Sequence, residues 1–129
     1  MNTAVRIGLC LLISGFLLSV AGCSKKTGSA SETIPVADVQ AEAGKMNVEQ
    51  LKAKAMDYKN AIVAKKADIE KLAAKIKAIP VTEQMGTEAK ALQTDLANLN
   101  KSVAALTERF QVYYNKLKEM GGDVSGLAL

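Results

Sequence analysis

The chain has 129 residues, enough for one small domain, and its 17 basic and 13 acidic residues give a net charge of +4. It contains no His, no Trp and two Cys. Without His there is no Cys/His cluster for a metal ion and no imidazole for acid–base catalysis. Aromatic residues make up 4% of the chain, too few for stacking on single-stranded nucleic acid, so we exclude nucleic acid as a partner.

The N-terminus has the layout of a secretory signal peptide. An apolar run begins at Ile7, after a short segment whose only charge is Arg6, and it ends just before Cys23. A permanent transmembrane anchor is the alternative. Crossing a bilayer takes roughly 20 apolar residues, and the run is shorter than that, so the signal peptide is favoured.

The residues that end at Cys23, Leu-x-Val-Ala-Gly-Cys, resemble the lipobox of bacterial lipoproteins. The resemblance implies cleavage between Gly22 and Cys23 and attachment of lipid to the Cys23 thiol. The mature chain would then be held to a membrane through this lipid. Ser24 directly after the lipidated residue favours the outer membrane, facing the periplasm, if the cell is Gram-negative.

Residues 23–46 are predicted to form a lipid-anchored tether with one short helix. From Ser24 to about Pro35 the sequence has almost nothing to bury, which indicates a flexible segment. The short helix is predicted from Pro35 to Ala43, because Pro is favoured in a first helical turn. Gly44 is expected to interrupt it.

A first long helix is predicted to begin at Asn47, which can form a capping box with Gln50. Pro80 is expected to end it, since Pro lacks a backbone donor and disfavours the α conformation at Ile79. Lys65 is the one charged residue of its heptad seam. We expect its stem to pack and its amino group to turn outward, with a register-setting or binding role as the alternative. The seam residues recur at alternating spacings of four and three: Leu51, Ala55, Tyr58, Ile62, Lys65, Ile69, Leu72, Ile76 and Ile79.

A second long helix is predicted from Thr82, which can cap it, to Met120. Gly121 is expected just after its end, in the position where a left-handed residue terminates many helices. The second seam has the same alternating spacing and no charged member: Met85, Ala89, Leu92, Leu96, Leu99, Val103, Leu106, Phe110, Tyr113, Leu117 and Met120.

The predicted fold is all-α: a long antiparallel two-helix coiled-coil hairpin over residues 47–120, with its turn near 80–82, after the cleaved signal peptide (1–22) and the flexible tether. Pairing residues whose numbers sum to 164 or 165 sets Ile62 beside Val103 and Ile79 beside Met85. The C-terminal tail, 121–129, lacks a helical period. We expect it to be frayed, with a short docking peptide as the alternative.

The first long helix carries the positive charge, because residues 47–79 hold eight Lys against four acidic residues. Such a face is usually only solvated; a weak electrostatic contact with an anionic envelope surface is the alternative. Candidate partner contacts are Lys59 and Lys66 on this helix and Val81 and Glu83 at the turn. We expect no catalytic residue, metal site or cofactor, because the carboxylates lie along a rod that encloses no cleft.

The lipobox and helical body resemble small envelope lipoproteins such as Braun's lipoprotein, which is helical, lipid-anchored and linked to peptidoglycan through a C-terminal lysine. The sequence here ends in Gly-Leu-Ala-Leu, so wall linkage is not carried over. The paired helices also resemble the α-helical arm of periplasmic adaptor proteins in efflux assemblies, although the other domains of those adaptors are missing.

These observations together predict a non-enzymatic envelope lipoprotein that acts as a structural spacer. The alternative is an accessory adaptor that docks another envelope protein through the hairpin tip or the basic face. The expected partners are the membrane, through lipid on Cys23, and an envelope protein or cell-wall polymer. Self-association into a homo-oligomer is left open.

Overall fold

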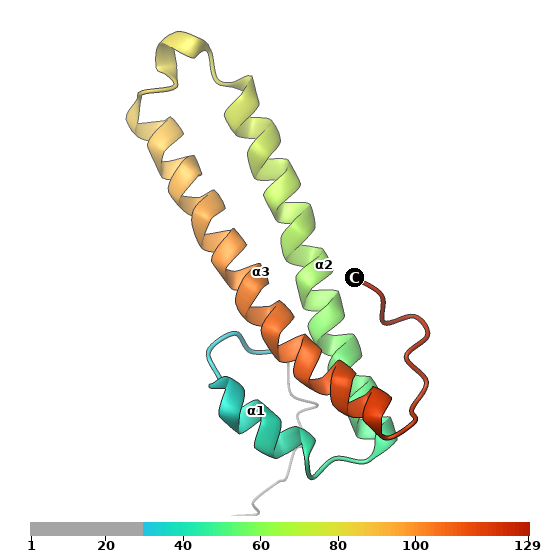
Figure 1. Ribbon diagram of the computed structural model, residues 1–129. Coiled ribbons are helices and arrows are strands. Elements are labelled where there is room, and N and C mark those ends of the chain that lie inside the picture. Colours follow the sequence, from blue (N-terminus) through green and yellow to red (C-terminus); the bar gives the residue numbers. More distant parts are fainter. Residues whose placement is uncertain (1–29) are drawn as a thin grey trace, which may run out of the picture.

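The computed structural model describes residues 30–129, and this part of the chain is all-helical, without a strand (Figure 1). Its elements are α1 (Val36–Ala43), α2 (Val48–Ala78), the 3-10 helix η1 (Val81–Glu83) and α3 (Thr87–Glu119). Gly22 and Cys23 lie outside the described residues, together with the whole predicted signal peptide.

The short helix α1 forms where the sequence predicted it. The Pro35 carbonyl accepts the backbone N–H groups of Asp38 and Val39, each at 3.1 Å, and so closes the first turn. Val39 and Ala43 lie one turn apart on the same face, and both are buried. Residues 44–47 then lead the chain into α2.

The predicted capping box starts α2. The Asn47 side-chain oxygen accepts the Gln50 backbone N–H at 2.8 Å, and the Gln50 side-chain oxygen accepts the Asn47 backbone N–H at 3.1 Å. Two N–H groups that lack helical partners are therefore satisfied. At the other end Ile79 is extended (φ −73°, ψ 128°) ahead of Pro80, as expected for a residue before Pro.

The connector after Pro80 is longer than predicted, and the predicted start of the second helix at Thr82 is wrong. The chain makes two tight turns, in which the Glu83 N–H donates to the Pro80 carbonyl and the Gly86 N–H to the Glu83 carbonyl, each at 2.8 Å. Gly86 is extended and stands at the N-cap, so α3 begins only at Thr87. A helix from Thr82 would have placed Gly86 in its interior, where Gly is destabilising.

The C-terminal end of α3 follows the sequence prediction. Gly121 has a left-handed conformation (φ 71°). The Gly122 N–H donates to the Leu117 carbonyl at 2.9 Å, and the Gly121 N–H donates to the Lys118 carbonyl at 3.0 Å. This pair of bonds is a Schellman motif, which satisfies two of the last carbonyls and turns the chain back.

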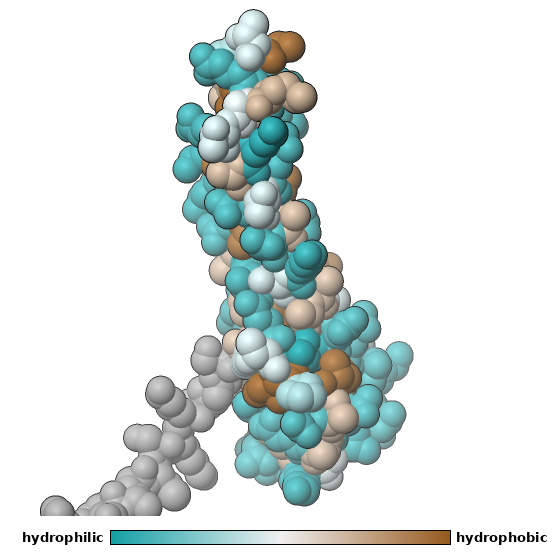
Figure 2. All heavy atoms as spheres, turned by 90° about the vertical axis from the view of Figure 1, so that its left-hand side faces the viewer, coloured by the Kyte–Doolittle hydropathy of each residue, from teal (hydrophilic) through white to brown (hydrophobic). Residues whose placement is uncertain are grey.

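Long helices α2 and α3 lie side by side, and α1 packs beside α3 at the end far from the connector (Figure 1). We call this end, residues 30–62 and 103–129, the base, and residues 63–102 the arm. Figure 2 shows a narrow and mostly hydrophilic arm above a broader base. The residues of the hydrophobic core cluster all belong to the base: Val39, Ala43, Leu51, Ala55, Tyr58, Ile62, Leu106, Phe110, Tyr113, Leu117 and Leu127.

The arm is packed less completely than the base. Ala89 is its one fully buried residue among those described, whereas Ile69, Leu72 and Leu99 remain partly exposed. Met85 is 82% exposed, so its predicted burial in the seam is wrong. Two packed helices bury only one stripe of side chains on each other. In the base, further segments of the chain bury additional side chains.

Both ends of the described chain belong to the base. Leu127 is completely buried in the core cluster, and Asp123 forms an ion pair of 2.7 Å with Lys52. The expectation of a frayed tail is therefore wrong. The apolar residues of the tail follow no helical period, so the sequence pattern gave no sign of this packing.

Replacing Gly122 by Ala is expected to lower the free energy of unfolding by about 1 to 3 kcal/mol through overpacking. A Cβ atom there would lie 2.9 Å from Leu117 Cγ and 3.0 Å from Val48 Cγ1. Urea unfolding followed by circular dichroism measures the loss. Gly44→Ala is the matched control, since its Cβ would meet only two carbonyl oxygens at 3.5 and 3.6 Å. Equal stability of the two variants would contradict the close packing of Gly122.

Candidate functional site

The predicted tip contacts lie on the connector, at the far end of the arm. Val81 and Glu83 belong to η1, and the Val81 side chain is 81% exposed. Met85 is equally exposed on the same connector, although the sequence pattern had assigned it to the buried seam. Glu83 and Met85, but not Val81, belong to the lining of an open hollow of about 530 Å³, which is made by Ile79, Thr82, Glu83, Met85, Gly86, Thr87 and Glu88. The connector therefore presents two large apolar side chains to solvent.

The two predicted lysine contacts lie elsewhere on the molecule and differ from each other. Lys66 is exposed on α2. Lys59 is partly buried and donates a hydrogen bond to the carbonyl of Gly126, so it holds the C-terminal segment against α2. Both lie roughly 20 to 30 Å along α2 from the connector at 1.5 Å per residue. The structure therefore does not bring Lys59 and Lys66 together with Val81 and Glu83.

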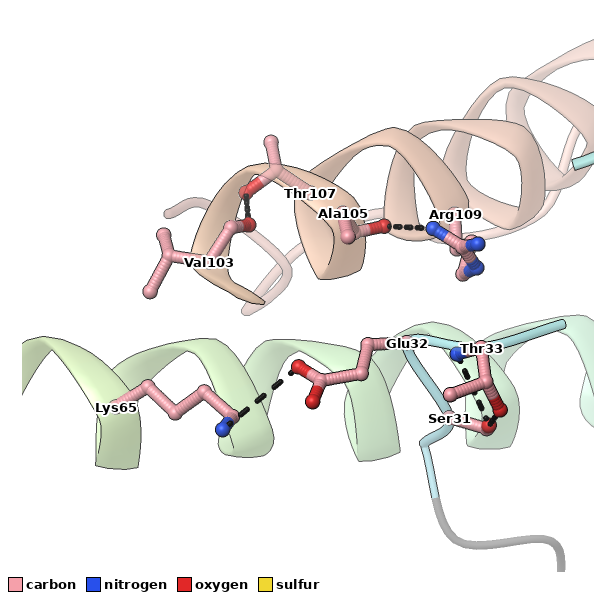
Figure 3. Close-up of polar contacts among 8 residues, drawn as sticks. All are labelled: Ser31, Glu32, Thr33, Lys65, Val103, Ala105, Thr107 and Arg109. Carbon is pink, nitrogen blue, oxygen red and sulfur yellow. Dashed lines mark hydrogen bonds and ion pairs between the residues drawn. The ribbon is translucent and has the colours of Figure 1, made fainter. Parts of the chain in front are cut away.

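Lys65, the charged residue of the predicted seam, has a partner far away in the sequence. Its amino nitrogen lies 3.7 Å from Glu32 Oε2, and its side chain is 31% exposed (Figure 3). At this distance the two groups form an ion pair, but they are too far apart for a hydrogen bond. Sequence spacing could not identify Glu32, because the pair joins α2 to the segment that precedes α1.

Two side chains form hydrogen bonds with the backbone of the segment before α1, residues 30–35. The Tyr58 hydroxyl donates to the Ser31 carbonyl at 3.1 Å and accepts the Ser31 N–H at 3.3 Å. Arg109, which is 7% exposed, donates from Nε to the Ile34 carbonyl at 2.7 Å. A second nitrogen of Arg109 donates to the Ala105 carbonyl at 2.6 Å (Figure 3). The last residues of the predicted flexible tether are therefore fixed in place.

A polar group at the centre of the base joins α1 to both long helices. The Tyr113 hydroxyl donates to Glu42 Oε2 at 3.0 Å, and Lys54 Nζ lies 3.3 Å from Glu42 Oε1. The Tyr58 and Tyr113 rings pack with their centroids 5.4 Å apart. Burial, followed by the hydrogen bond to Glu42, raises the pKa of Tyr113 far above its ordinary value. Tyr113 therefore stays protonated in the folded protein.

The C-terminal segment is held by charge as well as by Leu127. Lys52 donates a hydrogen bond to Asp123, and the Ser125 N–H donates to the other carboxylate oxygen at 2.8 Å. These bonds, that of Lys52 first, hold the pKa of Asp123 well below its usual range. Asp123 consequently remains ionised throughout the neutral and mildly acidic range.

Two further searches of the described residues concern metal sites and membrane-spanning helices. Residues 30–129 contain no group of three or more His, Cys, Asp or Glu placed to hold a metal ion. No helix in the same range has the length and apolar character needed to cross a membrane. Comparisons with protein-family models, with curated proteins and with solved structures gave no match.

The protein is expected to lose stability above about pH 10 through Tyr113. An unfolded Tyr ionises near pH 10, whereas the raised pKa keeps Tyr113 protonated in the folded state. The contribution of Tyr113 to the free energy of unfolding is therefore complete below pH 10. Above pH 10 it falls, by at most about 1.4 kcal/mol per pH unit, because the unfolded state loses a proton that the folded state keeps. Urea unfolding of the wild type and of Tyr113→Phe between pH 7 and 11 measures this. The stability difference between them should be constant up to pH 10 and shrink above it; a constant difference up to pH 11 would refute the assignment.

Proposed function

We propose that this protein is a lipoprotein of the bacterial cell envelope that is held to a membrane through lipid on Cys23 and acts as a non-enzymatic spacer. Support comes first from the lipobox-like sequence that ends at Cys23. Cys23 precedes Ala30 by seven positions, and seven extended residues span at most about 25 Å. The base would then lie within this distance of the attachment point. Ser24 favours the outer membrane, facing the periplasm, in a Gram-negative cell.

We further propose that α2 and α3 act together as an antiparallel coiled-coil hairpin. The two helices contain 31 and 33 residues, which corresponds to about 45 to 50 Å at 1.5 Å per residue. The observation that carries the spacer function is the contrast between the two ends. The core and the fixed chain ends belong to the base, and the arm extends away from it with hydrophilic sides (Figures 1 and 2). An arm of this kind would hold two envelope components at a fixed distance from each other.

The anchor is tested by metabolic labelling with a palmitate analogue in the native host. The wild-type protein should incorporate the label and partition with membranes, whereas Cys23→Ser should be unlabelled. Cys10→Ser is the matched control, because Cys10 belongs to the segment that would be removed. Equal labelling of wild type and Cys23→Ser would refute lipid attachment at Cys23.

An adaptor that docks through the connector is the second candidate function. It is supported by Val81 and Met85, which expose 81% and 82% of their surfaces at the far end of the arm. Exposed apolar side chains of this size at a protruding tip are typical of an interaction site. A pure spacer has no need of them.

Two sets of variants separate the spacer from the adaptor by their ability to restore a gene-deletion strain. Duplicating residues 66–72 and 93–99 together preserves the seam and lengthens the arm by about 10 Å. The double variant Val81→Ser with Met85→Ser removes the apolar tip and leaves the length unchanged. A spacer should lose function on lengthening and tolerate the tip change. An adaptor should show the opposite result.

A further inference from the structure

Residues 30–34, which we call the strap, lie across the two long helices ahead of α1. Within residues 30–129, no backbone N–H group of the strap donates to a backbone carbonyl. Its polar contacts with the base come from two side chains of α2 and one of α3: Tyr58, Lys65 and Arg109. The strap is therefore held by side chains of its neighbours and not by secondary structure of its own.

The helix that follows the strap is attached to the base independently of it. In α1, Val39 and Ala43 are 0% and 1% exposed and belong to the core cluster. In the strap, Ala30 and Ile34 pack against that cluster but are only partly buried. Glu42 adds polar contacts from α1 to both long helices. The contacts that hold α1 therefore remain when the strap leaves its place.

The docked strap buries a carboxylate oxygen without a hydrogen bond. Glu32 Oε2 is buried and accepts no hydrogen bond from residues 30–129. Figure 3 shows Glu32 pointing along α2 toward Lys65, whose amino nitrogen is 3.7 Å away, an ion-pair distance. Removing a carboxylate oxygen from water without giving it a donor costs free energy, and an undocked Glu32 is hydrated instead.

Undocking leaves the groups that held the strap with a replacement partner. The Tyr58 hydroxyl and Nε of Arg109 bond the backbone of Ser31 and Ile34. When the strap leaves, water enters the space that it occupied and bonds these same groups. The docked and undocked states are therefore close enough in free energy for a moderate force to change their balance.

We propose that the strap undocks reversibly while α1 and the rest of the base stay folded, which gives the protein two tether lengths. The change in tether length rests on the proposed lipid attachment at Cys23. With the strap docked, seven positions separate Cys23 from Ala30 and span at most about 25 Å. With the strap undocked, twelve positions separate Cys23 from Pro35 and span at most about 42 Å.

Tension between the lipid anchor and a partner on the arm would select the longer state. The strap is the first part of the described chain that such a pull reaches, because it lies between Cys23 and α1. A force shifts the balance only toward a state in which the pulled points are farther apart, and undocking provides that state. The spacer would then follow a change in the distance between the membrane and its partner without unfolding.

The experiment follows the strap and α1 by double electron–electron resonance at increasing urea concentrations. The full-length protein is held in detergent micelles, and Cys10→Ser with Cys23→Ser leaves only introduced cysteines for the spin labels. The strap pair is Thr33→Cys with Lys118→Cys, and both positions are exposed. In the control pair the first label is moved to Ala37, an exposed residue of α1. Circular dichroism of the same samples reports the unfolding of the helices.

Two substitutions that each remove one hydroxyl form a matched pair. Tyr58→Phe removes the group that bonds Ser31 twice and leaves the ring in the core. Tyr113→Phe removes the hydroxyl that bonds Glu42 of α1 and leaves the contacts of the strap intact. Circular dichroism in buffer checks that both variants are folded.

In the wild type, the Thr33 pair should give one narrow distance distribution in buffer. It should gain a second, broader one at urea concentrations below the unfolding transition, whereas the Ala37 pair should change only at that transition. Tyr58→Phe should raise the ratio of undocked to docked strap at least about fivefold, because two hydrogen bonds are lost. Tyr113→Phe should leave this ratio unchanged.

Three results would overturn the proposal. They are a Thr33 pair that changes only together with the Ala37 pair, a Thr33 pair without a narrow distance in buffer, and an equal effect of Tyr58→Phe and Tyr113→Phe. These samples carry Cys23→Ser, so the result does not depend on the lipid, which palmitate labelling tests separately. Failure of the strap proposal is therefore distinguishable from failure of the lipoprotein proposal.

Discussion

Two helices packed side by side can bury only one stripe of side chains each, and this limit shapes the whole molecule. A complete core needs a third layer. In the described part of this protein the layer is supplied by residues 30–43 on one side and by the segment around Leu127 on another. Where they are present, Tyr58, Tyr113 and Leu117 are completely buried. Where they stop, the same heptad pattern continues with half-exposed side chains.

The polar contacts of the base explain how residues 30–35 and the C-terminal segment are held in place. Fixing an irregular segment costs backbone entropy, so it must make contacts that the unfolded chain lacks. Tyr58 and Arg109 supply such contacts by bonding the backbone of Ser31 and Ile34, and Lys52 does so for Asp123. A buried Arg also needs acceptors for its donors, and two carbonyls provide them. The base and its end segments therefore stabilise each other.

This division into base and arm connects the structure to the proposed function. Core packing and fixed ends make the base the more resistant part, whereas the arm, with fewer buried contacts, is expected to open locally at lower cost. A tether attached close to the base would leave the arm free of the anchor. The connector is then the part of the arm farthest from the base.

The sequence by itself determined the local features of the fold. Asn47 with Gln50, Pro80 and Gly121 set helix ends, because capping, loss of a backbone donor and a left-handed conformation act over a few residues. The lipobox resemblance at Cys23 is likewise a local pattern. Heptad spacing also indicated the apolar faces of α2 and α3, since helical periodicity is written in the chain itself.

Only the tertiary structure decided which parts of those faces are covered. The pairing of Lys65 with Glu32, the bonds of Arg109 to Ile34 and the burial of Leu127 join positions that are remote in sequence. The exposure of Met85 was decided in the same way, because the later start of α3 removed it from the seam. Periodicity describes one helix at a time, whereas burial depends on what else packs against it, and no local pattern records that.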